Sequence, residues 1–474
     1  MKYQTLIGLE IHVELLTASK IFCGCSTAFG GESNTHCCPV CLGLPGALPV
    51  LNKKVVEFAV KAGLALNCNI ASVCKMDRKN YFYPDLPKAF QTSQYDMPIC
   101  TNGYIEIDCG KKKKIRIKRV HIEEDAGKTM HAEDGVSLID YNRCGVPLIE
   151  IVTQPDMTSS EEAYKFLERL KSILQYTEVS DCRMEQGSLR CDININVKSE
   201  DSSFVSNIVE VKNLNSFKAA AKAIEYEEKR HIDLLKKGEN TNKETRRWDE
   251  SKNKTVIMRM KENVEDYRYF PEPDLVKIEI DSDWVEKIRT SLPEMPNHKK
   301  ERFIKDYGLP LYDAEILTSS KGMADFFEEV VKEFQDAKMV SNWVMTEFYR
   351  SLKESESDIE NIKFCAKDFA KLLRLIKRGT ISNNIGKRIF KEMYNSGKDP
   401  EIIVKEKGLM QISDVDVIKE MVLKVLEEYP ESVMDYKNGK GRALGFLVGQ
   451  VMKVSKGKAN PQMVNKIIKK YLDT

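Results

Sequence analysis

The chain has 474 residues, of which 74 are Lys or Arg and 72 are Asp or Glu, so its formal net charge is +2. With 42% hydrophobic and 31% charged residues, it can form several folded domains, and disorder over most of its length is excluded. The near-neutral total also excludes a uniformly basic nucleic-acid-binding chain, although local patches of opposite charge cancel in such a sum.

The first 292 residues combine strand and helix patterns. Runs that alternate apolar and polar residues predict strands at 9–13, 115–122, 192–197 and 209–212. Apolar residues at helical spacing predict helices at 160–174 and 217–235. We therefore predict an α+β domain over residues 1–292.

From residue 293 onward the pattern is almost entirely helical. Apolar residues recur at helical spacing at 324–334, 362–376 and 417–426. Asn460 and Pro461 form a typical helix start, because asparagine caps helices well and proline suits the first helical position. We predict an all-α domain over residues 293–400 and a small helical tail domain over residues 401–474.

Thirteen cysteines occur in the chain, and five of them cluster near its N-terminus. Cys23 and Cys25 form one close pair and Cys38 and Cys41 another, with twelve residues between the pairs. Two such pairs predict a tetrahedral Zn²⁺ site, which would be structural because four thiolates leave no open position. Small buried thiols are the alternative, which we favour for the other nine cysteines. The rival ligands beside this quartet are Cys37 and His36.

The N-terminus lacks the features of an export signal. Glu10, His12 and Glu14 stand where a signal peptide needs an uninterrupted apolar run, and no stretch of about 18 apolar residues occurs. The odd number of cysteines also argues against a disulfide framework. We therefore expect a cytoplasmic protein with reduced thiols and no membrane association.

Polar side chains share one face on several predicted strands. The sets with a common face are Glu10 with His12, Asp192 with Asn194 and Asn196, and Glu210 with Lys212. Further polar groups lie at other strand ends, namely His121, Glu123, Glu124, Asp125 and Glu150. Together they would suit a hard divalent cation such as Mg²⁺. Solvated faces of half-buried sheets are the alternative, and spacing alone leaves both interpretations open.

Residues 79–87 read KNYFYPDLP, and residues 91–96 read QTSQYD. Aromatic rings beside amides and Lys79 would suit a pocket for a nucleotide or the end of a tRNA. An ordered surface loop anchored by its aromatic residues is the alternative. No GxxxxGK[ST] segment occurs, so any use of ATP does not depend on a P-loop.

The charge of the chain is unevenly distributed. Residues 435–474 contain nine basic and only two acidic residues. Such a basic tail would suit the phosphates of RNA, and a solvated helix surface is the alternative.

Several longer motifs together resemble the family of B subunits of aspartyl/glutamyl-tRNA(Asn/Gln) amidotransferases, over essentially the whole chain. These motifs are GLEIHV (8–13), CPVCLGLPG (38–46), KNYFYPDLP (79–87), EEDAGK (123–128), GVPLIEIV (145–152), GSLRCD (187–192), EVKNLNSF (210–217), DYRYFPEPDL (266–275) and GFLVGQVM (445–452).

The resemblance implies a catalytic cradle domain, a helical domain and a YqeY-like tail that contacts tRNA. It also implies that the enzyme phosphorylates the side-chain carboxylate of misacylated Glu-tRNA(Gln) or Asp-tRNA(Asn) with ATP and displaces the phosphate with ammonia. An A subunit would release that ammonia from glutamine, and a small C subunit would complete the heterotrimer.

Residue roles follow from the positions that match the family. The resemblance implies Mg²⁺ ligands at Glu10, His12 and Glu124. It implies acidic residues near a second cation or the ammonia path at Glu150, Glu185, Asp192 and Glu210. It implies contacts with phosphate or the acyl group at Lys79 and Arg190. It places structural zinc, as in some members, on Cys23, Cys25, Cys38 and Cys41. It implies tRNA contacts in the tail, for which the candidates are Lys440, Arg442, Lys453, Lys456 and Lys458.

Two other functions are consistent with the same sequence features. A tRNA-binding scaffold without its own catalysis would position RNA while the chemistry occurs elsewhere. A phosphoesterase that uses carboxylates and a metal would release cleaved RNA instead of an amidated product.

Overall fold

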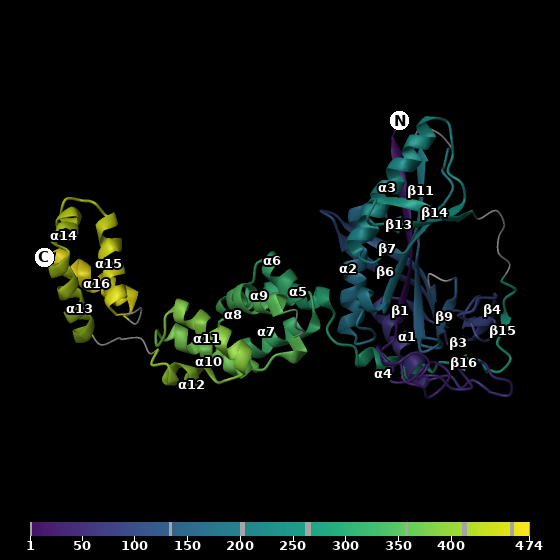
Figure 1. Ribbon diagram of the computed structural model, residues 1–474, viewed down its shortest axis with the longest axis horizontal. Coiled ribbons are helices and arrows are strands. Elements are labelled where there is room, and N and C mark those ends of the chain that lie inside the picture. Colours follow the sequence, from purple (N-terminus) through teal and green to yellow (C-terminus); the bar gives the residue numbers. More distant parts are fainter. Residues whose placement is uncertain are drawn as a thin grey trace. The chain divides into compact units, whose positions relative to one another are not determined.

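The computed structural model describes residues 2–131, 135–199, 204–260, 267–355, 359–409, 415–455 and 459–473 (Figure 1). The chain forms two compact units, Met1–Met295 and Pro296–Thr474. The first unit combines sheets and helices and the second is helical, which confirms the predicted fold class. The further division near residue 400 stays a prediction.

A nine-stranded sheet forms the centre of the first unit. Its strands, in spatial order, are β14 (Lys254–Met260), β13 (Glu244–Asp249), β12 (Val209–Lys212), β11 (Leu189–Ser199), β1 (Tyr3–Glu14), β10 (Pro147–Thr153), β7 (Lys112–Glu124), β6 (Cys100–Asp108) and β2 (Asn69–Ile70). Neighbouring strands pair antiparallel, except for the parallel pair β12 and β13. All four strands predicted from alternation lie in this sheet.

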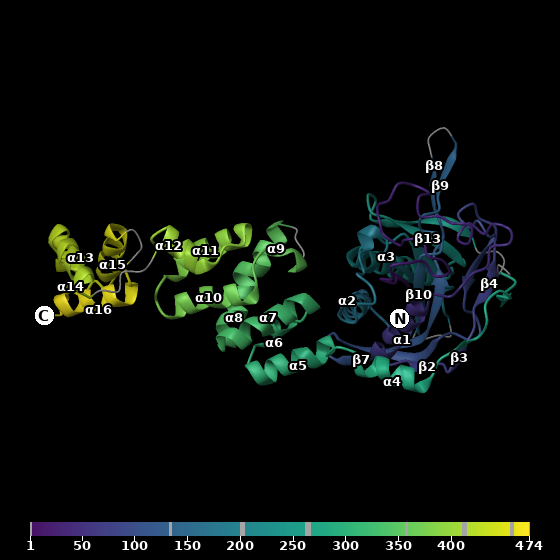
Figure 2. The same ribbon diagram turned by 90° about the horizontal axis from the view of Figure 1, so that it is seen from below.

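Helices cover one face of the sheet (Figures 1 and 2). They are α1 (Lys53–Ala65), α2 (Ser160–Tyr176) and α3 (Phe217–Lys236). Both predicted helices are confirmed, and each is capped by the serine just before it, whose side chain accepts a backbone N–H: Ser159 for α2 and Ser216 for α3. The opposite face carries no helix layer among the described residues and is called the open face below.

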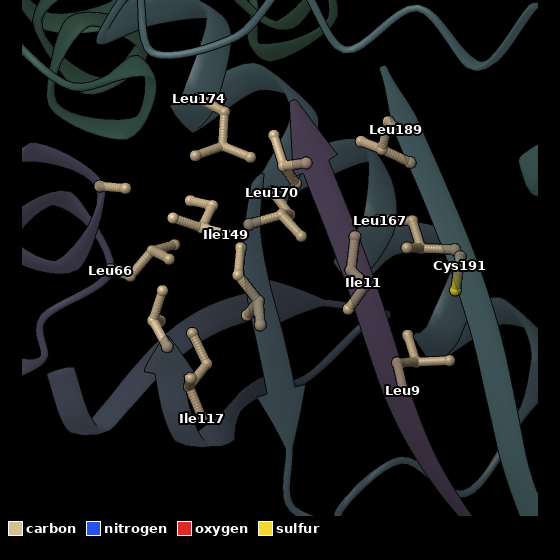
Figure 3. Close-up of a cluster of buried hydrophobic side chains, with 14 of the residues drawn as sticks. Leu9, Ile11, Leu66, Ile117, Ile149, Leu167, Leu170, Leu174, Leu189 and Cys191 are labelled. Carbon is tan, nitrogen blue, oxygen red and sulfur yellow. The ribbon is translucent and has the colours of Figure 1, made fainter. Parts of the chain in front are cut away.

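The core fills the space between the sheet and the helices. Because side chains alternate along a strand, β1 directs Leu9 and Ile11 toward the helices and the intervening polar residues toward the open face. Figure 3 shows these two residues beside Leu167 and Leu170 of α2, and all four are fully or almost fully buried. The alternation thus divides each strand into an apolar and a polar side.

Smaller sheets carry further segments of the first unit. They are β15 (Phe270–Pro271) with β4 (Asp77–Asn80) and β5 (Phe90–Ser93), β16 (Ile278–Glu279) with β3 (Val73–Cys74), and β8 (Lys128–His131) with β9 (Ser137–Asp140). The pairing of β15 with β4 brings residues 267–271 beside a strand almost 200 positions earlier in the chain. Helix α4 (Ser282–Thr290) packs against α1 near the end of the unit.

The second unit consists of short helices. In chain order the α-helices are α5 (Pro296–Tyr307), α6 (Leu311–Leu317), α7 (Lys321–Phe334), α8 (Ala337–Trp343), α9 (Tyr349–Ser355), α10 (Ala366–Lys377), α11 (Asn383–Ser396), α12 (Pro400–Glu406), α13 (Val415–Glu428), α14 (Pro430–Lys437), α15 (Arg442–Val454) and α16 (Pro461–Leu472). The predicted start of α16 is confirmed, since the Asn460 side chain accepts hydrogen bonds from two backbone N–H groups. Helices α13 to α16 share a small core around Val422, Leu447 and Ile468.

Candidate functional site

A row of polar side chains crosses four strands on the open face. His12 of β1 lies opposite Arg190 of β11 on one side and Glu150 of β10 on the other. Glu150 in turn lies opposite His121 of β7. Directly opposed residues in a sheet have neighbouring side chains on the same face, so the register brings together residues far apart in sequence.

Two imidazoles share two carboxylates in this row. His12 Nε2 lies 3.3 Å from Glu123 Oε1 and 3.4 Å from Glu150 Oε2. His121 Nε2 lies 3.5 Å from Glu123 Oε2 and 3.4 Å from Glu150 Oε2. The ligand atoms of His12, Glu123 and Glu150 all lie within 4.8 Å of one another, so this set, called the histidine group below, could bind a divalent cation.

Burial and charge act in opposite directions in the histidine group. Burial disfavours protonation of His12, but its hydrogen bond with Glu150 and the charge of Glu123 outweigh that effect and raise its pKa. At His121 burial is again outweighed, and the two carboxylates raise its pKa to about 9. Burial alone would raise the pKa of Glu150, but the two imidazoles hold it well below its usual value. The low pKa keeps Glu150 ionised at neutral pH, while the raised pKa of His12 means that a bound cation would have to displace a proton from its imidazole.

A second set of carboxylates lies on the same face. Oxygens of Glu10, Asp192 and Glu210 lie within 4.8 Å of one another, and these residues are called the acidic group below. Lys212 contacts both Asp192 and Glu210, the latter at 3.1 Å. Burial, followed by the charges of Glu150 and Glu210, raises the pKa of Glu10. A cation in this group would therefore favour the ionised form of Glu10.

Glu124 belongs to neither group. It follows Glu123 on β7 and points to the opposite side of the strand, where it accepts hydrogen bonds from Lys88 and, at 2.7 Å, from the backbone N of Thr92. Lys88 and Glu124 line a cavity of about 190 Å³, which Cys41 also borders.

The structure therefore does not bring together the three Mg²⁺ ligands implied by the resemblance. His12 lies in the histidine group, Glu10 in the acidic group and Glu124 beside Lys88. Sequence reasoning chose Glu124 and passed over its neighbour Glu123. The two-residue period of the strand was the available signal, because it puts Glu123 on the same face as His121.

Two arginines flank the histidine group. Among the described residues, the buried Nε atoms of Arg119 and Arg190 have no hydrogen-bond partner. Arg190 Nη2 donates to Asp125 at 2.9 Å, and Arg119 Nη2 lies 3.9 Å from Glu150. An unpartnered buried N–H is costly, and an anionic ligand oxygen would satisfy it. The arginines thus make this part of the open face suitable for a phosphate or carboxylate.

Lys79 lies in an aromatic cluster formed by two distant segments. Its Nζ lies 4.7 Å from the ring centroid of Tyr267 and 5.6 Å from that of Tyr81. The rings of Tyr95 and Tyr269 stack with centroids 4.4 Å apart. The exposed loop residue Phe82 does not anchor this segment. Asp266, the first residue of the second segment's motif, lies outside the described residues.

Glu185 is the remaining acidic residue implied by the resemblance. It is exposed on a short 3₁₀ turn, Met184–Gln186, that precedes β11. It belongs to neither the histidine group nor the acidic group.

The four predicted zinc ligands converge. The sulfurs of Cys23, Cys25, Cys38 and Cys41 all lie within 4.8 Å of one another. The hydrogen bond with Cys23, opposed by burial, lowers the pKa of Cys41 to about 4. Cys37 lies outside this set, and its Sγ is 3.9 Å from Asn142 Oδ1. The donor set and its compactness therefore fit a structural metal site with Cys38, not Cys37, as a ligand.

Three of the five candidate tRNA-binding residues of the tail are described. Arg442 and Lys453 are exposed at the two ends of α15, and Lys440 pairs with Asp435 at 2.9 Å. Lys456 and Lys458 lie outside the described residues. No helix in the described part of the chain is long and apolar enough to cross a membrane.

The fold and the site define a class of protein in which one sheet face presents two possible cation sites beside arginines whose buried Nε atoms have no partner among the described residues. Residues 5–286 match the family model described as the GatB/GatE catalytic domain, and residues 325–472 match the model of the GatB domain.

Full-length relatives are named as the B subunit of aspartyl/glutamyl-tRNA(Asn/Gln) amidotransferase. The protein of Thermoanaerobacter sp. (strain X514) is 61% identical and that of Caldicellulosiruptor bescii 59%, both over 100% of each chain. The protein of Clostridium botulinum (strain Loch Maree / Type A3) is 56% identical over 99% of this chain and 98% of its own. The chain belongs to this family of amidotransferase B subunits.

Proposed function

We propose that this chain phosphorylates the side-chain carboxylate of Glu-tRNA(Gln) or Asp-tRNA(Asn) with ATP and amidates it with glutamine-derived ammonia. The product would be Gln-tRNA(Gln) or Asn-tRNA(Asn), and the enzyme a carbon–nitrogen ligase. The observation that supports the proposal most is the histidine group beside the unpartnered Nε atoms of Arg119 and Arg190.

The order of the two steps follows from the chemistry of the substrate. A carboxylate is a poor electrophile because its negative charge repels nucleophiles. Transfer of the γ-phosphoryl group of ATP to a carboxylate oxygen gives an acyl phosphate, and attack by ammonia then expels inorganic phosphate. Such transfer depends mainly on positioning and electrostatic stabilisation, so no protein nucleophile is required.

The donors on the open face fit Mg²⁺, which when bound would neutralise charge on the transferred phosphoryl group. The histidine group would hold one ion and the acidic group a second. Arg190, with Arg119, would bind phosphate or carboxylate oxygens through its free Nε. Lys79, among its tyrosines, would contact the nucleotide or the acyl end of the tRNA.

Partners of the chain would include an A subunit that releases ammonia from glutamine and a C subunit that completes a cytoplasmic heterotrimer. Glu185, which lies in neither the histidine group nor the acidic group, would lie on the ammonia path.

The test uses the heterotrimer reconstituted with A and C subunits, ATP, glutamine and Glu-tRNA(Gln). Glu10→Ala and His12→Ala should each strongly impair transfer of γ-phosphate while the glutaminase activity of the A subunit remains. Transfer at the wild-type rate in both variants would refute the assignment. Release of cleaved RNA would favour the phosphoesterase, and phosphorylation that persists without this chain would favour a scaffold.

We also propose that Cys23, Cys25, Cys38 and Cys41 bind structural Zn²⁺. Cys41→Ser should lose the zinc measured by elemental analysis of the purified chain, and the matched control Cys37→Ser should keep it. Equal zinc loss in both variants would contradict the choice of ligands.

For the tail we propose tRNA contacts from Lys440, Arg442 and Lys453, together with Lys456 and Lys458. Replacing these five residues by glutamine should weaken tRNA binding and reduce its dependence on salt, since each lost phosphate contact lowers that dependence. An unchanged salt dependence of the dissociation constant would count against this role.

A further inference from the structure

Residues 111–119 form the densest basic segment of the first unit. They read KKKKIRIKR, with seven cations among nine residues, and all but the first lie on β7. The same strand continues through His121 and Glu123 to its end at Glu124, so the segment leads into the histidine group. None of the roles proposed above uses the segment between residues 111 and 118.

The pleat of β7 sends most of these cations to the open face. Ile115 and Ile117 are buried in the core under the helices, so the alternating residues between and beside them point the other way. The exposed residues on that side are Lys112, Lys114, Arg116 and Lys118. Only Lys113 turns to the helix side, where it pairs with Glu162 of α2 at 2.7 Å.

A β-bulge continues this stripe to the site. The register between β10 and β7 shifts between Val152 and Thr153, which lie opposite Arg119 and Ile117. The extra residue, Lys118, changes the parity of the strand, so Arg119 also faces the open side and lies 3.9 Å from Glu150. At 3.3–3.4 Å per residue, the stripe from Lys112 to Lys118 is about 20 Å long, and Arg119 connects it with the histidine group.

Carboxylates beside the stripe only partly neutralise it. Lys114 Nζ lies 3.6 Å from Glu106, and Arg116 forms a bidentate pair with Asp156. The Lys114–Glu106 pair is exposed to solvent and therefore weak, whereas Asp156 is only 17% exposed in its bidentate pair and neutralises Arg116 more firmly. Lys112 lies directly opposite Asp108 of β6, whereas Lys118 has no ion-pair partner among the described residues. The four cations of the stripe therefore still exceed the three carboxylates beside it, which are Glu106, Asp108 and Asp156.

The composition of this surface indicates the chemistry of its partner. No large hydrophobic side chain is exposed in the described stretch between residues 96 and 129, so the surface does not suit an apolar protein partner. It offers point charges at about 6.7 Å intervals along a strand. Such a pattern suits the repeated phosphates of a nucleic-acid backbone, which basic side chains bind without regard to sequence.

We propose that this stripe, Lys112, Lys114, Arg116 and Lys118, binds the phosphate backbone of the tRNA next to its aminoacylated end. The inference rests on the proposed function, because the aminoacyl group must reach the histidine group and the adjoining nucleotides then meet the end of β7. Contacts along the stripe would orient the tRNA without touching the reacting atoms.

The test compares two triple variants of the chain in the heterotrimer. Lys112→Gln/Lys114→Gln/Lys118→Gln removes three cations of the stripe. The control, Lys222→Gln/Lys229→Gln/Lys236→Gln, removes three exposed cations of α3, in the layer on the opposite face of the sheet. The dissociation constant for uncharged tRNA is measured at several salt concentrations without ATP or glutamine.

The stripe variant should bind tRNA 10- to 100-fold more weakly, and the slope of log K against log salt should fall by about 2. The control should match wild type. An affinity and a salt slope equal to those of wild type in the stripe variant would overturn the proposal. A stripe variant that binds tRNA normally but no longer binds anionic phosphatidylserine vesicles would also overturn it.

The outcome is distinguishable from a failure of the proposed function. Binding is measured without turnover, so a stripe variant with weakened tRNA binding would support this inference even if the wild-type heterotrimer did not phosphorylate Glu-tRNA. In an active heterotrimer the stripe variant should raise KM for Glu-tRNA at least 10-fold and keep kcat within threefold. A fall in kcat at unchanged KM would overturn it.

Discussion

The two faces of the nine-stranded sheet differ sharply, although the same strands form both. Toward the helices, Leu9 and Ile11 pack into a continuous apolar core. Toward the open side, Glu10 and His12 join two groups of titratable residues. Along one strand, alternate residues therefore either pack in the core and stabilise the fold or belong to the candidate site. Substitutions at adjacent positions should accordingly affect either stability or activity.

The largest effect is expected on the open face, at Glu150. Glu150→Gln keeps the shape of the side chain but removes the charge shared by His12 and His121. Loss of one charged cation ligand should slow phosphorylation of Glu-tRNA on the order of 10³-fold, equivalent to about 4 kcal/mol. The measurement is transfer of labelled phosphate from ATP. A rate within tenfold of wild type would contradict the assignment.

The neighbouring residue on the helix side should give the opposite result. Ile151 is fully buried, and Ile151→Ala leaves a cavity in the core. We expect the free energy of unfolding to fall by about 2–5 kcal/mol. Urea denaturation provides this value, and kcat at a temperature where the variant stays folded should remain within a few-fold of wild type. A large loss of kcat without a loss of stability would contradict the assignment of Ile151 to the core alone.

On the helix side of the sheet, a buried ionic network at α3 makes the stability of the fold depend on pH. Burial alone would raise the pKa of Glu227, but hydrogen bonds from His231 and Arg230 outweigh it and lower the pKa to about 2. Because this value lies below that of an unfolded glutamate, Glu227 stabilises the fold above pH 4.5, and this contribution is lost as pH falls toward 2.

Glu227→Gln should therefore lower the free energy of unfolding by about 3 kcal/mol at pH 7 and by much less near pH 2. Urea denaturation of both proteins at several pH values checks this difference. A destabilisation that does not change with pH would show that packing, and not charge, is the role of Glu227.

The smallest effect is expected from a residue that supports the acidic group. Thr245 of β13 donates a hydrogen bond to Glu210 Oε2 at 2.8 Å. Thr245→Val keeps the volume and removes this bond, so the affinity for Mn²⁺ at the acidic group should fall 10- to 100-fold. Electron paramagnetic resonance of bound Mn²⁺ measures it. Unchanged affinity would show that Thr245 does not orient Glu210.

The sequence by itself determined several features of this protein. Alternation fixed the polar and apolar faces of β1, the spacing of two cysteine pairs identified the thiolate cluster, and Asn460 marked the start of α16. Each signal is local: it depends on the geometry of a few consecutive residues, which the backbone imposes whatever surrounds it. Motifs along the whole chain also determined the family.

Only the tertiary structure decided which of these residues meet. The register between strands places His12 beside Glu123 and Glu150, whereas it places Glu10 beside Asp192 and Glu210. The bulge in β7 turns Arg119 to the open face. Register arises from packing across the whole sheet, which no single strand encodes. For this reason the sequence supplied the chemical groups on the open face, and the fold decided how they combine.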